Sequence, residues 1–350
     1  MILPEPKLRH ICHTLLLAAG APEHEARVVA DELTEASLMG IDSHGFMRLA
    51  QYLHMIKGGH IQPGAPQEVV HDTPVSAILD GHFNFGMVTA REMARLAVAK
   101  ARACHIAVVA SRRCRHVGRL GSFTRQIARE GFFAFATASG ATAGQMVAPF
   151  CGAGRRLCTN PLSYAVPTAG DPVILDMSTS AIAEGKIRLL QQQGNPPPDD
   201  CVLDPEGRPT NDPARFYDPP GGLILPFGGA LGYKGFGLSL LVEILGRALS
   251  GAGACDDYDN SLFLLAINPA ILGAADTFVA DIEAIKRHIL SCPSLPGAPA
   301  VTLPGGLDFA TRQARLQNGI PVSDATWSTI VAAAQCFGVK ADEISERGSE

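Results

Sequence analysis

The sequence lacks any cysteine spacing that would build a zinc site or a disulfide framework. Its nine cysteines are odd in number and scattered, and no two form a Cys-x-x-Cys pair. They are typical of free, mostly buried thiols in a reducing compartment. A chain of 350 residues buries roughly three quarters of its unfolded surface, so it needs no such crosslink for stability. The cysteines are Cys12, Cys104, Cys114, Cys151, Cys158, Cys201, Cys255, Cys292 and Cys336.

Long apolar runs and an excess of positive charge are also missing. No stretch approaches the roughly 18 apolar residues of a membrane-spanning helix, and residues 1–7 lack the features of a secretory signal. The 29 Lys and Arg against 34 Asp and Glu give a net charge of −5 with no basic stripe. We therefore expect a cytoplasmic protein that binds neither nucleic acid nor membranes, and whose partners are small molecules and other copies of itself.

Neither of the common glycine-rich phosphate-binding motifs is present. No Gly-x-Gly-x-x-Gly follows a predicted strand, and there is no Gly-x-x-x-x-Gly-Lys-Ser/Thr. The sequence Gly152-Ala153-Gly154 comes nearest, but it continues into Arg155 rather than to a third glycine. A dinucleotide, if one binds, therefore does not bind on a Rossmann turn.

The hydrophobic pattern that is present predicts an α/β (α+β) protein. Helical periodicity covers residues 8–18, 23–39 and 46–56, and from about residue 74 short apolar strands alternate with helices. The expected strands are 75–79, 106–110, 132–136, 173–175 and 262–267. The expected later helices are 88–103, 180–191, 235–249, 276–290 and 325–336. Residues 193–226 are rich in Pro and Gly and predict a long functional arm or an oligomer contact.

One candidate site follows the turn Asp42-Ser43-His44-Gly45. His44, Arg48 and Tyr52 are spaced four residues apart, which on one helix would place imidazole, guanidinium and phenol on one face. Arg48 could pair bidentately with a carboxylate, and His44 could exchange a proton near neutral pH. Ser43 could orient the histidine or simply cap the helix, and a solvated polar face is the competing interpretation.

A second candidate is the segment Arg115-His116-Val117-Gly118-Arg119-Leu120-Gly121, which follows the strand at 106–110. Its two arginines suit an anionic ligand and would lower the proton affinity of His116. A basic surface turn is an equally simple reading. Cys114 and His116 have no companion ligands at metal spacing, so we expect no metal here.

Three weaker candidates occur later in the chain. Asp176 ends a strand and could hold a histidine in one tautomer, although Asp before a helix is also an ordinary cap. Thr159-Asn160-Pro161 resembles a turn. Tyr233-Lys234-Gly235 resembles a helix start where backbone N–H groups and Lys234 could meet phosphate, and Pro304-Gly305-Gly306 is the least specific turn of all.

Taken together and in order, these segments resemble the malate/L-lactate dehydrogenase family, whose members lack a Rossmann fold. The resemblance covers nearly the whole chain, and six segments stand in register. They are residues 42–45 with Arg48 and Tyr52, then 116–121, 155–161, 176–186, 204–210 and 226–238.

The resemblance implies a fold, an activity and a set of roles. The fold would combine a non-Rossmann mixed-sheet cofactor domain (residues 76–300) with a helical domain built from both chain ends (1–75 and 301–350), working as a homodimer. The activity would be NAD(P)-dependent hydride transfer to or from C2 of a small 2-oxo or 2-hydroxy acid of the malate, lactate or hydroxypyruvate type. Catalytic roles would fall to His44, Ser43 and Asp176, substrate binding to Arg48, Tyr52, His116, Gly118, Arg119, Leu120 and Thr159, and cofactor binding to Asp176, Met177, Ser178, Lys186, Tyr233, Lys234, Pro304, Gly305 and Gly306.

The chain departs from the family pattern around the expected cofactor site. Tyr233-Lys234 replaces the usual His-Lys, and Pro304-Gly305-Gly306 replaces the usual Pro-Gly-Glu. The resemblance therefore does not choose between NAD and NADP. Two alternative functions remain: reduction of a cyclic imine carboxylate (pyrroline- or piperideine-2-carboxylate), and a catalytically silent paralogue that binds a carboxylate. The Gly118-Arg119-Leu120-Gly121 segment favours the 2-hydroxy acid branch over the imine reductases.

Overall fold

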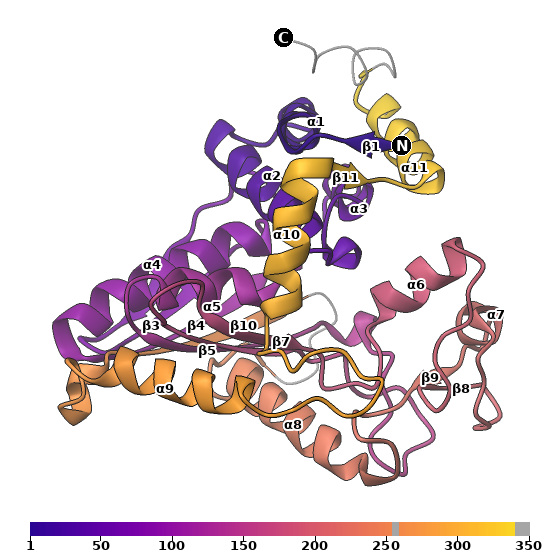
Figure 1. The fold of residues 1–350 in the computed structure, drawn as a ribbon. Helices are drawn as coiled ribbons and strands as arrows, with labels where there is room; N and C mark the ends of the chain where they lie inside the picture. Colours follow the sequence, from indigo (N-terminus) through magenta and orange to yellow (C-terminus); the bar gives the residue numbers. More distant parts are fainter. Residues whose placement is uncertain (254–258, 340–350) are drawn as a thin grey trace.

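The two ends of the chain meet in one helical layer. A computed structural model describes residues 1–253 and 259–339. β1 (Ile2–Leu3) pairs with β11 (Ile320–Pro321), which joins the start of the chain to its last part. Around this pair lie α1 (Glu5–Ala18), α2 (Glu23–Leu38), α3 (Arg48–Lys57), α10 (Gly306–Asn318) and α11 (Asp324–Gln335), as Figure 1 shows. The predicted helical part built from both chain ends is confirmed.

A seven-stranded mixed sheet forms the second part. Its order is β2-β3-β4-β10-β5-β6-β7, in which the pair β3–β4 is parallel and the other pairs are antiparallel. The strands are β2 (Glu68–Asp72), β3 (Ser76–Asp80), β4 (Ile106–Cys114), β5 (Phe133–Ser139), β6 (Leu162–Val166), β7 (Val173–Met177) and β10 (Asn260–Ile267). This order belongs to no doubly wound parallel sheet, so the predicted non-Rossmann fold class is confirmed.

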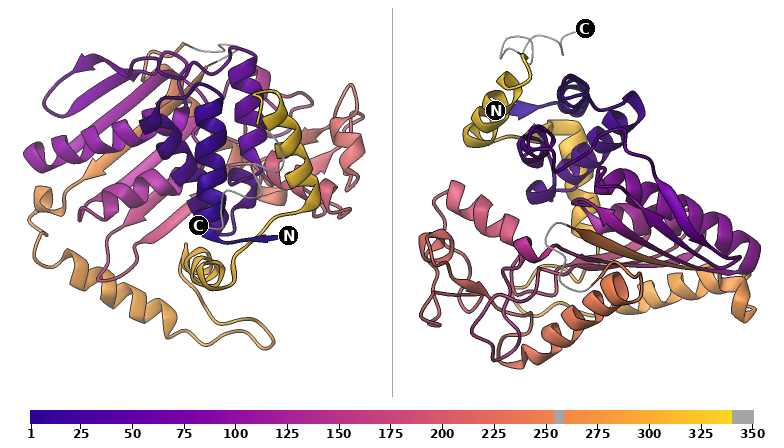
Figure 2. Two further views of the ribbon diagram at one scale, coloured as in Figure 1. Left: turned by 90° about the horizontal axis from the view of Figure 1, so that it is seen from above. Right: turned by 180° about the vertical axis from the view of Figure 1, so that it is seen from behind.

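Helices cover both faces of the sheet. α4 (Gly86–Cys104) and α5 (Leu120–Ala128) lie on the face toward the helical layer, whereas α8 (Tyr233–Glu243) and α9 (Phe278–Leu290) lie on the other (Figures 1 and 2). In α4, Ala90, Ala94, Ala97 and Ala101 recur at helical spacing and are fully buried. These small side chains allow α4 to approach the sheet closely.

A single hydrophobic core runs from α1 and α2 through α4 and α5 to the central strands. The domain boundaries at residues 75 and 300 therefore stay predictions. A smaller core holds the arm after β7, in which α6 (Glu184–Gln192), β8 (Val202–Leu203), α7 (Pro213–Tyr217) and β9 (Leu223–Ile224) pack on one another. Part of the segment that lacked periodicity is thus a folded lobe.

Several sequence expectations need correction. The helix expected from residue 180 begins at Glu184, and the one expected to run to residue 249 changes at Ile244–Ala248 into a π-helical turn. The prediction of mostly buried thiols is wrong. All eight described cysteines are free, and two of them, Cys12 and Cys114, are buried. Cys255 lies outside the described residues. None of the helices in the described ranges is long and apolar enough to span a membrane.

Candidate active site

A cavity of about 520 Å³ opens between the helical layer, the sheet and the lobe. This volume falls within the usual range for small-molecule sites. Its walls come from the turn before α3, α3 itself, the loop after β4, the end of β5, the segment 158–161 and the start of α6. Of the predicted site residues, those that line it are His44, Arg48, His116, Gly118 and Thr159.

His44 lies in a short 3-10 helix, η1 (Asp42–His44), and not on α3. The single-helix geometry expected for His44, Arg48 and Tyr52 is therefore wrong. The chain turns sharply after His44 because Gly45 passes against α2, where a Cβ would lie 2.2 Å from Ser37 Oγ. The turn, and not helical spacing, brings His44 to the cavity.

The His44 ring is oriented by its neighbour. Ser43 Oγ lies 3.0 Å from His44 Nδ1, which leaves Nε2 for a ligand. Burial, with the positive charges of Arg48 and Arg119, lowers the pKa of His44 to about 3. The imidazole is therefore neutral at neutral pH when the cavity holds no anion, in contrast to the near-neutral titration expected from the sequence.

The Arg48 side chain is 9% exposed and is held in a fixed orientation. Its Nε donates to Ser43 O at 2.7 Å and its Nη1 to Gln51 Oε1 at 2.6 Å, while Nη2 lies 3.7 Å from Glu184 Oε2. Helix α6 comes this close because residue 185 is glycine, where a Cβ would lie 2.6 Å from Arg48 Nη2. The remaining terminal N–H groups of Arg48 are available to a carboxylate.

His116 stands opposite His44 and is held by Tyr52. The two imidazole rings stack, with their centroids 5.6 Å apart, and the Tyr52 hydroxyl lies 2.7 Å from His116 Nδ1. Burial and the charges of Arg48 and His44 hold the pKa of His116 well below its usual value. The direction agrees with the sequence prediction, but the cationic neighbour is Arg48 and not the flanking arginines. Tyr52 supports the histidine and does not itself line the cavity.

Arg119 and Leu120 lie behind the cavity, only 3% and 1% exposed. Arg119 is placed between two carboxylates, with Nη2 3.4 Å from Asp308 Oδ2 and Nε 3.7 Å from Asp176 Oδ2. Asp176 also accepts a hydrogen bond from Gly121 N at 2.7 Å. Burial raises the pKa of Asp176, against the effect of Arg119. The predicted relay thus differs from the structure in one respect: Ser43 contacts His44, whereas Asp176 contacts Gly121 and Arg119.

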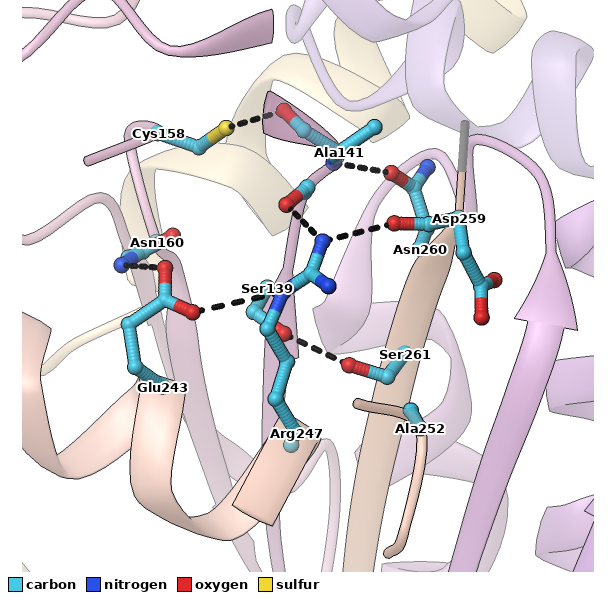
Figure 3. Close-up of polar contacts among 12 residues, drawn as sticks. Ser139, Ala141, Cys158, Asn160, Glu243, Arg247, Ala252, Asp259, Asn260 and Ser261 are labelled. Atoms are coloured by element: carbon cyan, nitrogen blue, oxygen red, sulfur yellow. Dashed lines mark hydrogen bonds and ion pairs between the residues drawn. The ribbon is translucent and has the colours of Figure 1, made fainter. Parts of the chain in front are cut away.

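The floor of the cavity rests on a buried polar network, drawn in Figure 3. Arg247, on the π-helical turn, donates to Asp259 O at 2.8 Å and also to Gly140 O, and it pairs with Glu243 at 3.4 Å. Glu243 in turn accepts from Asn160 Nδ2 at 2.8 Å. Gly140 and Asn160 line the cavity. The network therefore ties helix α8 to two walls of the site.

The predicted cofactor residues lie along the β7 edge of the sheet and not in the cavity walls. The turn at Pro304 meets β7, since Ile174 N donates to Pro304 O at 3.2 Å. The start of α8, with Tyr233 and Lys234, connects to the same edge through Phe227, whose N–H donates to Thr179 O at 2.9 Å and whose carbonyl accepts from Gly235 N at 3.1 Å. Met177 is the last residue of β7, and Ser178 follows it. Gly305 and Gly306 lie at the turn that begins α10, whereas Lys186 is exposed on α6.

Several cavity residues were not named as site residues from the sequence. Asn160 and Glu184 lie in the segments 155–161 and 176–186, which resemble the family. The match of these segments to the family pattern could have identified both residues. Gln51, Arg188 and Asn260 had no such signal, because each reaches the cavity through the fold. Asn260 begins β10 and accepts from Ala141 N at 3.1 Å.

Comparison with known proteins identifies the family. The family model described as malate/L-lactate dehydrogenase matches residues 3–331. The chain belongs to this family. It is 36% identical to hydroxycarboxylate dehydrogenase B of Escherichia coli (strain K12) over 332 residues, which cover 91% of this chain and 90% of that protein.

Solved structures agree with this assignment. Malate dehydrogenase from Pyrococcus horikoshii OT3 has a TM-score of 0.88 at 29% identity, covering 97% of this chain and 96% of that one. Δ1-Piperideine-2-carboxylate reductase from Pseudomonas syringae pvar. tomato has a TM-score of 0.82 at 25% identity, covering 95% and 99%. Membership of the malate/L-lactate dehydrogenase family places the chain among oxidoreductases, and the relatives named dehydrogenases act on hydroxy acids.

Proposed function

We propose that the protein transfers a hydride between NAD or NADP and C2 of a small 2-oxo or 2-hydroxy acid. The observation that carries the proposal is the convergence of Arg48, His44 and His116 on one cavity. A fixed guanidinium can bind the carboxylate of such an acid, and two imidazoles can contact and protonate the neighbouring carbonyl or hydroxyl oxygen.

The cavity also fits a flat aromatic ring beside the substrate. One wall, at the end of β5 and in η2 (Thr142–Gly144), is built from small residues: Gly140, Ala141, Ala143 and Gly144. The edge of β7, with Asp176 and the Pro304 turn, would hold the rest of the cofactor. When bound, the nicotinamide would supply or accept the hydride.

The chain's own residues would orient the acid and move one proton. Arg48 binds the carboxylate through its free terminal N–H groups, and His116 donates from Nε2 to the substrate oxygen or to the carboxylate. In oxidation, His44 Nε2 accepts the hydroxyl proton as the C2 hydrogen leaves with its electron pair. In reduction, His44 returns that proton to the carbonyl oxygen.

The electrostatics of the cavity favour proton uptake together with substrate. Arg48 is one of the charges that lower the pKa of His44. A substrate carboxylate on Arg48 neutralises that charge, so the pKa of His44 rises when the anion binds. The histidine that is neutral in the empty cavity can then carry the proton needed for reduction.

A substrate panel tests the proposal. Purified protein is mixed with NADH or NADPH and with pyruvate, oxaloacetate, hydroxypyruvate or the two cyclic imine carboxylates, and turnover is followed at the nicotinamide absorbance. We expect oxidation of one reduced cofactor by at least one 2-oxo acid. Reduced cofactor that binds, by fluorescence, without turnover of any compound would favour the silent paralogue, and turnover of imines alone would replace the proposed substrate class.

Imine reduction is the second candidate. It is supported by the similarity to Δ1-piperideine-2-carboxylate reductase over 95% of this chain. A cyclic imine carboxylate would use the same Arg48 and His44, with nitrogen and not oxygen as the protonated atom. The panel above separates the two functions.

We also propose that the protein is a homodimer formed through α8 and the turn after it. This segment exposes five large apolar side chains, each at least 37% accessible: Leu238, Leu240, Leu241, Ile244 and Leu249. A patch of this kind on a monomer usually marks an interface. Light scattering after gel filtration should give twice the chain mass, and Leu241→Asp should halve it. A monomeric wild-type protein would contradict this proposal.

A further inference from the structure

A second cavity, of about 460 Å³, lies beside α2. It is formed where α2, α4, α5 and α10 meet, the crossing visible in Figure 1. Every lining residue is polar or charged: Arg9, Asp31, Glu32, Glu35, Arg91, Ser122, Arg125, Gln126, Arg129 and Arg312. No residue of this set lines the active-site cavity.

The two ends of this cavity differ in charge balance. At the α1–α4 end the carboxylates are matched, since Asp31 pairs with Arg9 and Arg91, and Glu32 accepts from Arg91 at 2.8 Å. Arg9 also pairs with Glu5 outside the cavity. At this end every carboxylate and guanidinium group is paired, and no positive charge is in excess.

At the α5–α10 end one carboxylate serves three guanidinium groups. Glu35 accepts from Arg312 Nε at 2.9 Å and pairs with Arg125, and the exposed Arg129 guanidinium has no hydrogen bond or ion pair within the described residues. Burial and the charge of Arg125 lower the pKa of Arg129, even though Glu35 and Asp171 act in the opposite direction. Among the lining residues, three guanidinium groups beside one carboxylate give this end an excess of positive charge.

Two further polar atoms at this end lack a hydrogen-bond partner. Ser122 Oγ and Arg125 Nε are buried and unpaired within the described chain, and the Arg125 side chain is 9% exposed. An unsatisfied buried polar atom normally costs free energy, so a native protein that keeps one usually has a ligand or water for it. Ser122 and Arg125 on α5, with Arg129 directly after its last residue, lie on one face at spacings of three and four residues.

We propose that the α5–α10 end of this cavity binds a doubly charged tetrahedral oxyanion, a phosphate ion or a phosphate ester. Two negative charges balance the excess of two guanidinium groups over Glu35. Arginine forks together with a serine hydroxyl form a donor set that suits phosphate oxygens. The volume admits an ester with a small organic group.

The position of the site gives it a connection to the active site. α5 begins directly after the loop that carries His116, and α2 ends shortly before η1 with His44. From α10, Arg315 donates to Asp42 Oδ1 at 2.6 Å. An anion held by Arg125, Arg129 and Arg312 would thus link the elements that hold both histidines.

Binding is tested directly by calorimetry on the full chain at low ionic strength, with inorganic phosphate and phenyl phosphate as probes. We expect both to bind wild-type protein, and Arg129→Gln to weaken binding about tenfold, the loss typical of a charged hydrogen bond. The matched control is Arg95→Gln, which removes an exposed arginine of α4 that lies outside this cavity and pairs with Glu92. Tighter binding of phenyl phosphate would identify an ester as the ligand, and equal binding the free ion.

Three results would overturn the proposal. They are no binding of either probe, equal affinity in wild type and Arg129→Gln, and competition of the probes with NADH or NADPH, which would place the ion in the cofactor site. Ser122→Ala provides a second variant that does not change the charge. Because the readout is anion binding, its outcome does not depend on whether the proposed dehydrogenase activity is correct.

Discussion

At the scale of single residues, the two histidines of the candidate active site differ in the side chain that contacts ring nitrogen Nδ1. His44 Nδ1 meets the Ser43 hydroxyl, which can turn to donate or accept, so His44 can change protonation state without losing its partner. His116 Nδ1 meets the Tyr52 hydroxyl, and burial raises the pKa of Tyr52 above its ordinary value. Tyr52 therefore stays protonated and holds His116 in one orientation. The proposed function gives proton transfer to His44 and substrate binding to His116.

Replacing His44 tests that assignment. His44→Ala should lower kcat by about 10²–10⁴-fold, the usual contribution of a general acid or base, while NAD(P)H still binds. Steady-state kinetics and cofactor fluorescence measure the two quantities. His71→Ala, on the exposed strand β2, is the control and should keep wild-type kinetics. An unchanged kcat in His44→Ala would assign proton transfer to another group.

The fixed fork of Arg48 predicts a different kinetic change. Arg48→Lys keeps the charge but loses the geometry set by Ser43 O and Gln51, so KM for the acid should rise about 10–100-fold. The variant Arg95→Lys on α4 should leave KM unchanged. Equal KM values for wild type and Arg48→Lys would mean that the substrate carboxylate binds elsewhere.

The sequence predicted five of the residues that line the cavity and fewer of their contacts. His44, Arg48, His116 and Thr159 were identified because they lie in segments that resemble the family and occur in the expected order along the chain. The burial of Arg119 behind the cavity was not predicted, because its partner Asp308 on α10 lies 189 residues away in the sequence. The partners of Asp176 were missed because Gly121 and Arg119 lie more than 50 residues from it in the sequence.

At the scale of secondary-structure elements, the π-helical turn at Ile244–Ala248 has a supporting role. Its Arg247 is 5% exposed and joins the ends of β5 and β10 (Figure 3). Unusual turns of this kind in an α-helix are frequent next to functional sites.

Removing Arg247 should therefore cost stability. Arg247→Leu leaves Glu243 without its cation and three backbone carbonyls without their donor, and we expect a loss of about 3–5 kcal/mol in the free energy of unfolding. Urea denaturation measures it, with exposed Arg95→Leu as a control that should stay within about 0.5 kcal/mol. A loss no larger than that of the control would show that the network does not support the fold.

Elements were predicted well where their periodicity is local. The core strands β3, β4, β5, β7 and β10 were each expected within a few residues, whereas β2, β6 and α5 were missed. The two missed strands lack a continuous apolar run, since Ser163 interrupts β6 and polar side chains begin and end β2. α5 has nine residues, too few for a clear period. The position of β10 between β4 and β5 could not be predicted, because strand pairing across more than 100 residues leaves no local pattern.

At the scale of the whole molecule, the two cavity histidines make stability depend on pH. Their pKa values are lowered in the folded protein, to about 3 for His44, and return to about 6.5 in the unfolded chain. Below pH 6.5 the unfolded chain binds protons that the folded protein does not. The free energy of unfolding should therefore fall as the pH drops from about 6.5 toward 3.

Urea denaturation at pH 7.5 and pH 5 measures this dependence. The double variant His44→Asn/His116→Asn should lose less stability between these pH values than wild type, by at most about 1.4 kcal/mol per pH unit for each histidine. His71→Asn, on exposed β2, should leave the dependence unchanged. Identical pH dependence in the double variant and wild type would show that the folded protein protonates both rings freely.

The place of β10 in the sheet has a consequence for synthesis. By the time a ribosome has released residue 250, six of the seven strands exist, but the strand that joins β4 to β5 has not yet emerged. The nascent chain then presents two open strand edges, which are sites for aggregation. We expect the yield of this protein in a recombinant host to depend on chaperones and on translation speed before residue 260, more than on the stability of the finished fold.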